Sequence, residues 1–490
     1  MTSGTTPFTM AGTAFAAVPA IAPEQAHPYW TFERMAAALG TGPSMPMPLA
    51  GVSTDTRHLV RGDVFVALRG ERFDAHDFLA QARDAGAAAL VVSDPLPAVG
   101  LGLPVYVVPD TLVALGQLAT AWRKAWGRSV IAVAGSNGKT STKELLRAAL
   151  RGTFEVHATA GNLNNLIGVP LTLLAIPSHA DIAVVELGTN APGEVATLRA
   201  IAAPDVAVLT SIGEEHLEGL GDLSGVLREE CEVFHGVTMA VTPAAHPEVA
   251  TLAADRAQAV VTAGLTDAQV MPSAWGLDDE GRPWFDVDGV HFTLPLRGAH
   301  QAANAMLAVA VARACGVPLE SAAAGMATMP VPNMRGVWET IGEATVINDA
   351  YNANPPSMRA ALTLLDGVGA GRQRVAILGT MRELGAHAAA QHEAIARAAL
   401  ASSADLIVGV GEFDAAFRAI AETDMDTAGN TAENTAVNTA TARVITADDP
   451  ERAWQLVQPR LARNAVILLK ASRGVRLERL LPQLTTWATT

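Results

Sequence analysis

The stretch VIAVAGSNGKTSTKE at residues 130–144 constrains the fold of this 490-residue chain more than any other. An apolar run, a glycine-rich turn and a polar helical pattern follow one another without a break. Gly135 and Gly138 allow a tight turn whose N–H groups face an anion, and the helix that begins near Lys139 adds its positive dipole end. The stretch therefore predicts a buried strand, a phosphate-binding loop and a helix within an α/β domain.

The loop departs from the full G-x-x-x-x-G-K-[ST] pattern, because Val133 occupies the place of the first glycine. What remains still suits a nucleotide, since Lys139 can reach the β- and γ-phosphates and the Thr140 hydroxyl can bind Mg²⁺. A strand–helix turn without a ligand is the alternative interpretation. The residues that we expect to bind the nucleotide here are Gly135, Ser136, Asn137, Gly138, Lys139 and Thr140.

Strands and helical segments alternate along the rest of the chain, which predicts three α/β domains of the usual size of about 100–200 residues. Residues 29–112 predict a small α/β domain that begins with a helix at 29–40 and has β-rich segments at 63–70, 88–94 and 105–110. Residues 113–330 predict a central parallel-sheet domain with buried strands at 130–135, 182–188 and 206–213. Residues 331–490 predict a Rossmann-like domain with strands at 344–351, 374–381, 405–411, 442–448 and 465–472.

Two segments are expected to lie outside these domains. Residues 1–28 lack both the positive charge of a signal peptide and the length of a membrane span, so we expect a disordered lead-in. Residues 423–443 are a low-complexity run of Thr, Ala and Asn, which is typical of a flexible surface insertion.

Composition excludes several classes of protein. The net charge of −15 and the absence of a basic run argue against a nucleic-acid partner. Two distant cysteines, Cys231 and Cys315, exclude a disulfide scaffold and fit a reducing compartment. We therefore expect a cytoplasmic monomer that does not insert into a membrane.

Two further polar residues follow predicted strands of the central domain. Glu186 ends the strand at 182–188, and His216 follows the strand at 206–213. Ligand sites in open α/β sheets form at the carboxyl ends of strands, so Thr140, Glu186 and His216 are expected to converge. Singly, Glu186 or His216 is better explained by a structural or surface position than by metal binding. Together the three residues suit Mg²⁺ held jointly with phosphates.

Several motifs resemble those of the Mur ligases, ATP-dependent amide-bond ligases of peptidoglycan precursor synthesis. The similar segments of the central domain are GSNGKT at 135–140, GNLNNLIGVPLTLL at 161–174, TSIGEEHLEGLG at 210–221 and RGAHQAANAMLAVAVA at 297–312. The last of these has Gln301 where the family usually has Asn. The resemblance covers residues 30–490.

Three motifs of the C-terminal domain resemble one branch of the family, which adds D-alanyl-D-alanine to UDP-MurNAc-tripeptide. They are DAYNANPPSM at 349–358, LGTMRELGAHAAAQH at 378–392 and LLKASRGVRLERL at 468–480. In the first domain, GVSTDTR at 51–57 and GERFDAHDF at 70–78 are similar to the UDP-sugar-binding domain that this branch shares with the tripeptide-forming branch. The D-N-P-R motif of the tripeptide-forming branch is absent, and folylpolyglutamate synthetases have no such first domain. A tripeptide-forming ligase and a catalytically silent nucleotide-binding homologue are the alternatives.

The resemblance implies ATP, two Mg²⁺ ions and a role for each matching residue. Lys139, His216 and Arg335 would act in catalysis, and His300, Asn304, Arg335 and Asp349 would contact ATP. Arg335 would reach the phosphates when the C-terminal domain closes on the central one. Ser53, Thr54, Asp55 and Arg57 would bind the uridine diphosphate end of the tripeptide substrate. The other residues expected to bind the two substrates are Asn162, Asn165, Tyr351, Asn352, Asn354 and Arg473. For Arg57 a plain turn, and for Arg335 and Arg473 a surface position, are the alternatives.

One departure from the family concerns Glu230. Most Mur ligases have a lysine here that CO₂ carbamylates. This chain has no lysine between residues 144 and 469, so we expect no carbamylated lysine. The permanent carboxylate of Glu230 can replace it as a metal ligand beside Thr140, Glu186 and His216. The alternatives are a solvated acidic helix face formed by Glu229, Glu230 and Glu232, or impaired activity.

Overall fold

The computed structural model describes residues 26–428 and 442–490 and divides the chain into two compact units. The first unit contains residues up to Arg128 together with 166–179 and 200–203; the second contains the remainder. Most of the predicted lead-in and the central part of the predicted insertion lie outside the described residues, although helix α14 extends to Ala428. Among the described residues, no helix combines the length and apolar character needed to cross a lipid bilayer.

The first unit is built on a four-stranded parallel sheet in the order β1-β2-β3-β4. Its elements are α1 (Phe32–Leu39), β1 (Val52–Ser53), β2 (Val64–Val66), α2 (Leu79–Asp84), β3 (Ala89–Val92), β4 (Val105–Val107), α3 (Thr111–Trp126) and α5 (Gly168–Leu174). The unit ends at Arg128 rather than at residue 112, because α3 packs on α1, β3 and α5. The predicted helix at 111–126 therefore belongs to the first unit.

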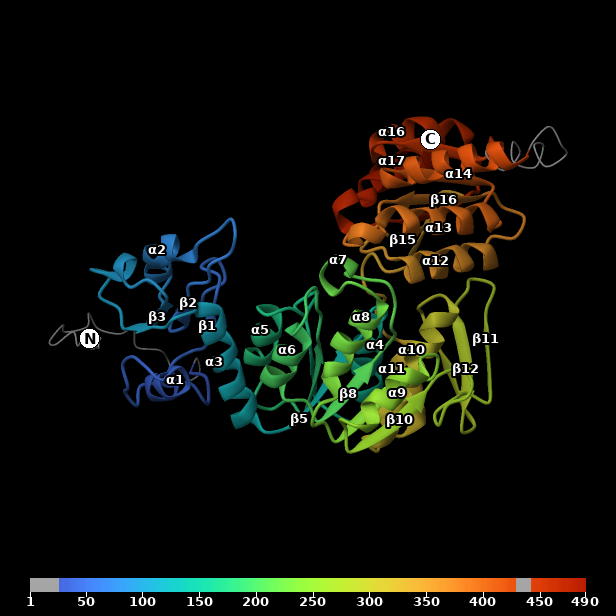
Figure 1. Cartoon of the computed structure of the whole chain (residues 1–490). Coiled ribbons are helices and arrows are strands. Elements are labelled where there is room, and N and C mark those ends of the chain that lie inside the picture. The colour runs from blue at the N-terminus through green and yellow to red at the C-terminus, as the bar shows by residue number, and fades with distance from the viewer. Residues whose placement is uncertain (1–25, 429–441) are drawn as a thin grey trace. The chain divides into compact units, whose positions relative to one another are not determined.

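The central sheet of the second unit has six parallel strands in the order β10-β9-β8-β5-β7-β6. Three of them, β5, β8 and β10, are labelled in Figure 1. These strands are β5 (Ser129–Ala134), β6 (Val156–Ala158), β7 (Ile182–Glu186), β8 (Val206–Leu209), β9 (Met239–Pro243) and β10 (Ala259–Ala263). The helices of this part are α4 (Lys139–Leu150), α6 (Glu194–Ala202), α7 (Leu217–Leu220), α8 (Leu223–Glu230), α9 (Pro247–Ala254), α10 (Ala299–Ala314) and α11 (Leu319–Ala327). Because β5 lies between β7 and β8, the loops that follow these three strands leave the same edge of the sheet.

A small antiparallel sheet, β11-β12-β13, follows the central sheet in the chain. Its strands are β11 (Ala274–Leu277), β12 (Pro283–Val287) and β13 (Val290–Thr293). Phe285 and Phe292 stack at 4.9 Å between ring centres and join the core formed by β5, α4 and α10.

The C-terminal sheet has the order β14-β15-β19-β16-β17-β18, in which only β14 is antiparallel to its neighbour. Strands β15 and β16 are labelled in Figure 1. Its strands are β14 (Val337–Ile341), β15 (Ala344–Asp349), β16 (Arg374–Gly379), β17 (Leu406–Val410), β18 (Val444–Ala447) and β19 (Val466–Lys470). Its helices are α12 (Pro355–Gly367), α13 (Ala388–Ala401), α14 (Glu412–Ala428), α16 (Pro450–Val457) and α17 (Leu481–Thr489). The predicted α/β class and all eight predicted strands after residue 129 are confirmed.

Candidate active site

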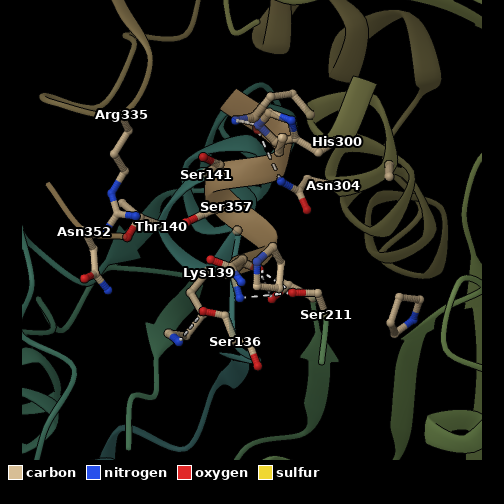
Figure 2. Close-up of a pocket in the computed structure, with 18 of the residues that line it drawn as sticks. Ser136, Lys139, Thr140, Ser141, Ser211, His300, Asn304, Arg335, Asn352 and Ser357 are labelled. Carbon is tan, nitrogen blue, oxygen red and sulfur yellow. Dashed lines mark hydrogen bonds between the residues drawn. The ribbon is translucent and has the colours of Figure 1, made fainter. Parts of the chain in front are cut away.

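A cavity of about 920 Å³ lies in the second unit, a size that suits a nucleotide. It is lined by the glycine-rich loop, by residues after β7 and β8, by one side of α10 and by residues 335–361. Figure 2 shows Lys139 and Thr140 from the loop, His300 from α10, and Arg335 and Asn352 from the C-terminal segment around this space. The expected convergence of loop and strand ends is therefore present.

The glycine-rich loop is held by its two glycines and by the neighbouring strand. Gly135 has φ +115°, and a Cβ there would lie 2.5 Å from Oγ1 of Thr210. Gly138 has φ +87°, and a Cβ there would lie 2.8 Å from Oδ1 of Asn304. The N–H of Ser136 donates to the carbonyl of Ser211, 2.8 Å away. Only glycine fits the two positions, so the loop shape follows directly from the sequence.

Lys139 is the first residue of α4, and its ammonium group folds back over the loop. Nζ donates to the carbonyl oxygens of Gly135 and Ser136. Burial opposes the charge, but Glu215, Glu230 and Glu186 outweigh it and raise the pKa of Lys139. The side chain is therefore a charged group ready to meet a phosphate.

Thr140 and Glu186 form the direct contact that their positions predict. The Thr140 hydroxyl donates to Oε2 of Glu186 at 3.0 Å, and Nδ2 of Asn164 donates to Oε1 at 2.9 Å. Glu186 ends β7 and is 1% exposed. Both Thr140 and Glu186 line the cavity, as do the predicted Asn162 and Asn165.

His216 lies before α7 with a left-handed backbone, and its ring is held from two sides. Nδ1 lies 2.5 Å from Oε2 of Glu383, which comes from the loop after β16. The two groups form an ion pair. Nε2 lies 3.7 Å from Oε2 of Glu215. Burial lowers the pKa of His216, but Glu383 and Glu215 outweigh burial and raise it.

Glu215 is a buried carboxylate beside Lys139 that the sequence analysis did not select. It is 5% exposed, lines the cavity, and its Oε1 lies 3.8 Å from Nζ of Lys139. Burial and the nearby Glu230 raise the pKa of Glu215 to about 7, against the opposing effect of Lys139.

Glu230 occupies the position behind the loop. It is 0% exposed, its Oε2 accepts the N–H of Gly135 at 2.7 Å, and it is not among the residues that line the cavity. Burial raises the pKa of Glu230, whereas Lys139 and the Gly135 N–H act against this rise. Its neighbour Glu229 accepts the N–H groups of Gly193 and Val195. The alternative of a solvated acidic face is therefore wrong for Glu229 and Glu230.

The expected adenine side is formed by α10 and the end of β15. His300 and Asn304 lie one turn apart on α10, and both line the cavity. Asp349 ends β15, lines the cavity and pairs with Lys470 at 2.7 Å. Burial lowers the pKa of His300, although Asp349 opposes the shift, so its ring is favoured in the neutral form that can accept a hydrogen bond.

Of the residues predicted to bind substrate in the C-terminal segment, some line the cavity and others do not. Tyr351 and Asn352 line the cavity, and the Arg335 guanidinium lies over the Tyr351 ring, 4.3 Å from its centre. Arg473 lies over the same ring at 5.5 Å but is not among the lining residues. Asn354 also does not line the cavity; its Oδ1 accepts the N–H of Ser357 and caps α12.

The predicted uridine-diphosphate residues lie in the first unit. Arg57 forms an ion pair with Asp55 at 2.7 Å, and this hydrogen bonding lowers the pKa of Asp55. The Ser53 hydroxyl donates to the carbonyl of Asp55, while Thr54 is half-buried between them. This is the geometry of a local turn, the alternative given above for Arg57.

Four residues near the cavity had no assigned role in the sequence analysis: Asn164, Glu215, Glu383 and Lys470. Asn164 lies between the two asparagines that were selected, and Glu215 precedes a selected histidine, so adjacency was the available signal. Glu383 and Lys470 lie in the motif segments 378–392 and 468–480, but those motifs gave neither residue a role.

The donor set fits a nucleotide-bound divalent cation. Among the described residues, no group of three or more His, Cys, Asp or Glu side chains is arranged to hold a metal by itself. Mg²⁺ bound with nucleotides takes only one or two protein carboxylates and completes its shell with phosphates and water. The Thr140–Glu186 pair suits that role, and the buried Oε1 of Glu215 has no hydrogen-bond partner among the described residues.

Three sequence models of known families match the chain. They are described as "Mur ligase family, catalytic domain" over residues 48–123, "Mur ligase middle domain" over 133–312 and "Mur ligase, glutamate ligase domain" over 336–473. Together they give the three-domain order expected from the sequence.

Curated proteins and solved structures are similar over nearly the whole chain. The UDP-N-acetylmuramoyl-tripeptide–D-alanyl-D-alanine ligase of Bacillus subtilis is 34% identical over 442 residues, 89% of this chain and 93% of that one. A crystal structure of MurF from Acinetobacter baumannii has a TM-score of 0.83 at 30% identity, over 94% of this chain and 100% of that one. MurF of Thermotoga maritima in complex with ADP has a TM-score of 0.74 at 26% identity, over 90% and 98%.

Proposed function

The chain belongs to the Mur ligase family, and we propose that it joins D-alanyl-D-alanine to UDP-N-acetylmuramoyl-tripeptide with conversion of ATP to ADP and phosphate. The observation that carries this proposal is a shared cavity: the phosphate loop and the loop of Tyr351 and Asn352, whose motif marks this branch, line the same space. The curated relatives carry the name of this ligase, so a tripeptide-forming activity is not favoured.

The reaction proceeds in two steps in this proposal. The terminal carboxylate of the tripeptide attacks the γ-phosphorus of ATP, which gives an acyl phosphate and ADP. The amine of D-alanyl-D-alanine then attacks the acyl carbon, and phosphate leaves from the tetrahedral intermediate. Such a reaction needs positioning and neutralisation of charge rather than covalent help from the protein.

The residues of the cavity are suited to these needs. Lys139 supplies a buried positive charge next to the loop N–H groups, which suits the β- and γ-phosphates. Arg335 reaches the cavity from the C-terminal segment and supplies a second cation. Mg²⁺, held by Thr140 and Glu186, would neutralise phosphate oxygens when bound. His300 and Asn304 would hold adenine, and Asp349 the ribose.

The remaining assignments belong to the same proposal. Asn162, Asn165, Tyr351 and Asn352 would contact the peptide substrates, and Arg473 a substrate carboxylate. The residues that would bind the uridine diphosphate are Ser53, Thr54, Asp55 and Arg57. A second Mg²⁺ and a monomeric state are further predictions, as is a cytoplasmic location, which the sparse cysteines support.

The test is phosphate release from ATP with Mg²⁺, UDP-MurNAc-tripeptide and D-alanyl-D-alanine, with each component omitted in turn. We expect release that needs all components and is unchanged by bicarbonate, since no lysine lies between residues 144 and 469. Release with a different amine would assign another ligase activity, and no release under any condition would support a silent homologue.

A further inference from the structure

The carboxyl group of Glu215 is buried beside the phosphate loop. Its side chain is 5% exposed, and its Oε1 is buried without a hydrogen-bond partner among the described residues. The nearest cation is Nζ of Lys139, at 3.8 Å, which is beyond hydrogen-bond distance. Burying a polar atom without a hydrogen bond costs free energy. We therefore expect a ligand that enters the cavity to supply the missing partner of this oxygen.

The imidazole of His216 faces the same carboxylate. Glu383 holds Nδ1 of His216 from behind, which leaves Nε2 directed toward Oε2 of Glu215 at 3.7 Å. A carboxylate behind one ring nitrogen is the usual arrangement when the other nitrogen binds a metal. Adjacent ligands of Mg²⁺ lie about 3 Å apart, since each stands about 2.1 Å from the ion. A small side-chain rotation would bring Nε2 and Oε2 to that spacing.

Glu230 is less well placed for the same task. Its Oε2 accepts the Gly135 N–H. Its Oε1 is buried without a hydrogen-bond partner among the described residues, as Oε1 of Glu215 is, but Glu230 does not line the cavity whereas Glu215 does. Its Oε2 instead holds the loop through the Gly135 N–H, and its charge raises the pKa of Lys139.

We propose that Glu215, together with His216 and not with Glu230, binds a divalent cation next to Lys139 in the nucleotide cavity. This inference rests on the proposed function, because the cation is expected to enter with ATP. It assigns a ligand role to Glu215, and it leaves Glu230 as a positioning residue that holds the phosphate loop.

The experiment compares wild type, Glu215→Gln, Glu230→Gln and the matched control Glu214→Gln. Glu214 is the adjacent glutamate in the sequence and is not among the cavity-lining residues. Binding of the non-hydrolysable ATP analogue AMP-PCP is measured by calorimetry in Mn²⁺ and in EDTA. Bound Mn²⁺ is counted by electron paramagnetic resonance at saturating AMP-PCP, and thermal melting confirms that each variant is folded.

We expect Glu215→Gln to bind one Mn²⁺ fewer than wild type and to bind AMP-PCP at least about tenfold more weakly in Mn²⁺. In EDTA the same variant should bind AMP-PCP as tightly as wild type or more tightly, because a carboxylate that repels phosphate is gone. Glu214→Gln and Glu230→Gln should retain the wild-type number of Mn²⁺ ions. This opposite response to Mn²⁺ and EDTA is one that a purely structural role of Glu215 does not produce.

Two results would overturn the inference while leaving the proposed function intact. One is a wild-type Mn²⁺ count in folded Glu215→Gln; the other is a lost ion in Glu230→Gln with none lost in Glu215→Gln. Failure of wild type to bind AMP-PCP in Mn²⁺ would instead contradict the proposed function. If Glu215→Gln does not fold, Glu215→Asp takes its place, with weaker Mn²⁺ binding expected because the shorter carboxylate stands farther from Nε2 of His216.

Discussion

Lys139 contributes its charge to a loop that already offers N–H groups to a phosphate. We expect Lys139→Met to lower kcat/KM for phosphate release by a factor of about 10²–10³, the usual effect of removing one group that stabilises transition-state charge. The matched control is Lys124→Met, an exposed lysine near the end of α3 in the first unit. Steady-state phosphate release measures both variants. Equal rates for the two would show that Lys139 does not contribute to the reaction.

Replacing either of two adjacent glutamates of α8, Glu229 or Glu230, by glutamine should change the stability of the protein in opposite directions. Burial raises the pKa of Glu230 above its unfolded value of about 4.3. Its ionised form therefore costs folding free energy, and this cost grows as pH rises from about 4.3 through the raised pKa. Glu230→Gln should raise the melting temperature at pH 8, and the gain should vanish as pH falls toward about 4.3.

Glu229→Gln is the matched comparison for that prediction. The carboxylate of Glu229 accepts two backbone N–H groups at 2.7 and 2.8 Å, and an amide NH₂ cannot accept the second of them. We expect a loss of about 1–3 kcal/mol in the free energy of unfolding. Melting curves at several pH values between 5 and 8 measure both variants. A pH-independent effect of Glu230→Gln would mean that its carboxylate is not the source of the change.

At the scale of elements, the geometry at the start of helix α12 indicates that Asn354 caps the helix and does not bind a substrate. Asn354 accepts the N–H of Ser357, and the Ser357 hydroxyl accepts the N–H of Asn354, so the two form a capping box. Asn354→Ala should lower stability by about 1 kcal/mol and leave KM for D-alanyl-D-alanine nearly unchanged. A large rise in that KM without a change in melting temperature would instead support the predicted contact between Asn354 and the substrate.

Asn162 should give the reverse pattern and serves as the comparison for Asn354. It is exposed and lines the cavity, so its side chain is available to a substrate. Asn162→Ala should raise KM for UDP-MurNAc-tripeptide and leave the melting temperature unchanged, because no packing or cap is lost. Initial rates over a range of tripeptide concentrations, with a melting curve beside them, measure both effects.

The elements themselves were predictable because their signals are local. The buried strands that became β5, β7 and β8 are apolar runs, and the loop after β5 carries glycines whose positive φ angles no other residue fits. What could not be predicted depends on tertiary contacts. The sequence alone does not tell that Asn354 faces its own helix, or that Glu230 lies behind the loop while Glu215 faces the cavity. The end of the first unit at Arg128 likewise depends on packing of α3.

At the scale of the whole molecule, the cavity is assembled from segments that are far apart in the chain. The loop after β16 contacts α7 through the Glu218 N–H, which donates to the carbonyl of Glu383, and through His387, whose Nε2 lies 3.1 Å from the carbonyl oxygen of Gly221. The same loop holds His216, so the ring orientation of a predicted metal ligand depends on a residue from the C-terminal sheet. Nucleotide binding and the docking of this loop are therefore expected to support each other.

This coupling predicts that the chain becomes more compact when ATP analogue and substrate bind. Small-angle scattering should show a smaller radius of gyration with AMP-PCP, Mg²⁺ and UDP-MurNAc-tripeptide than without them. Arg335→Ala should reduce the change, because Arg335 is the cation that the C-terminal segment brings to the cavity. Arg359→Ala, an exposed arginine on α12, should contract as wild type does. An unchanged radius of gyration in wild type would contradict closure. If Arg335→Ala contracts as much as wild type, closure depends on contacts other than those of Arg335, and the loop of Glu383 is the next to test.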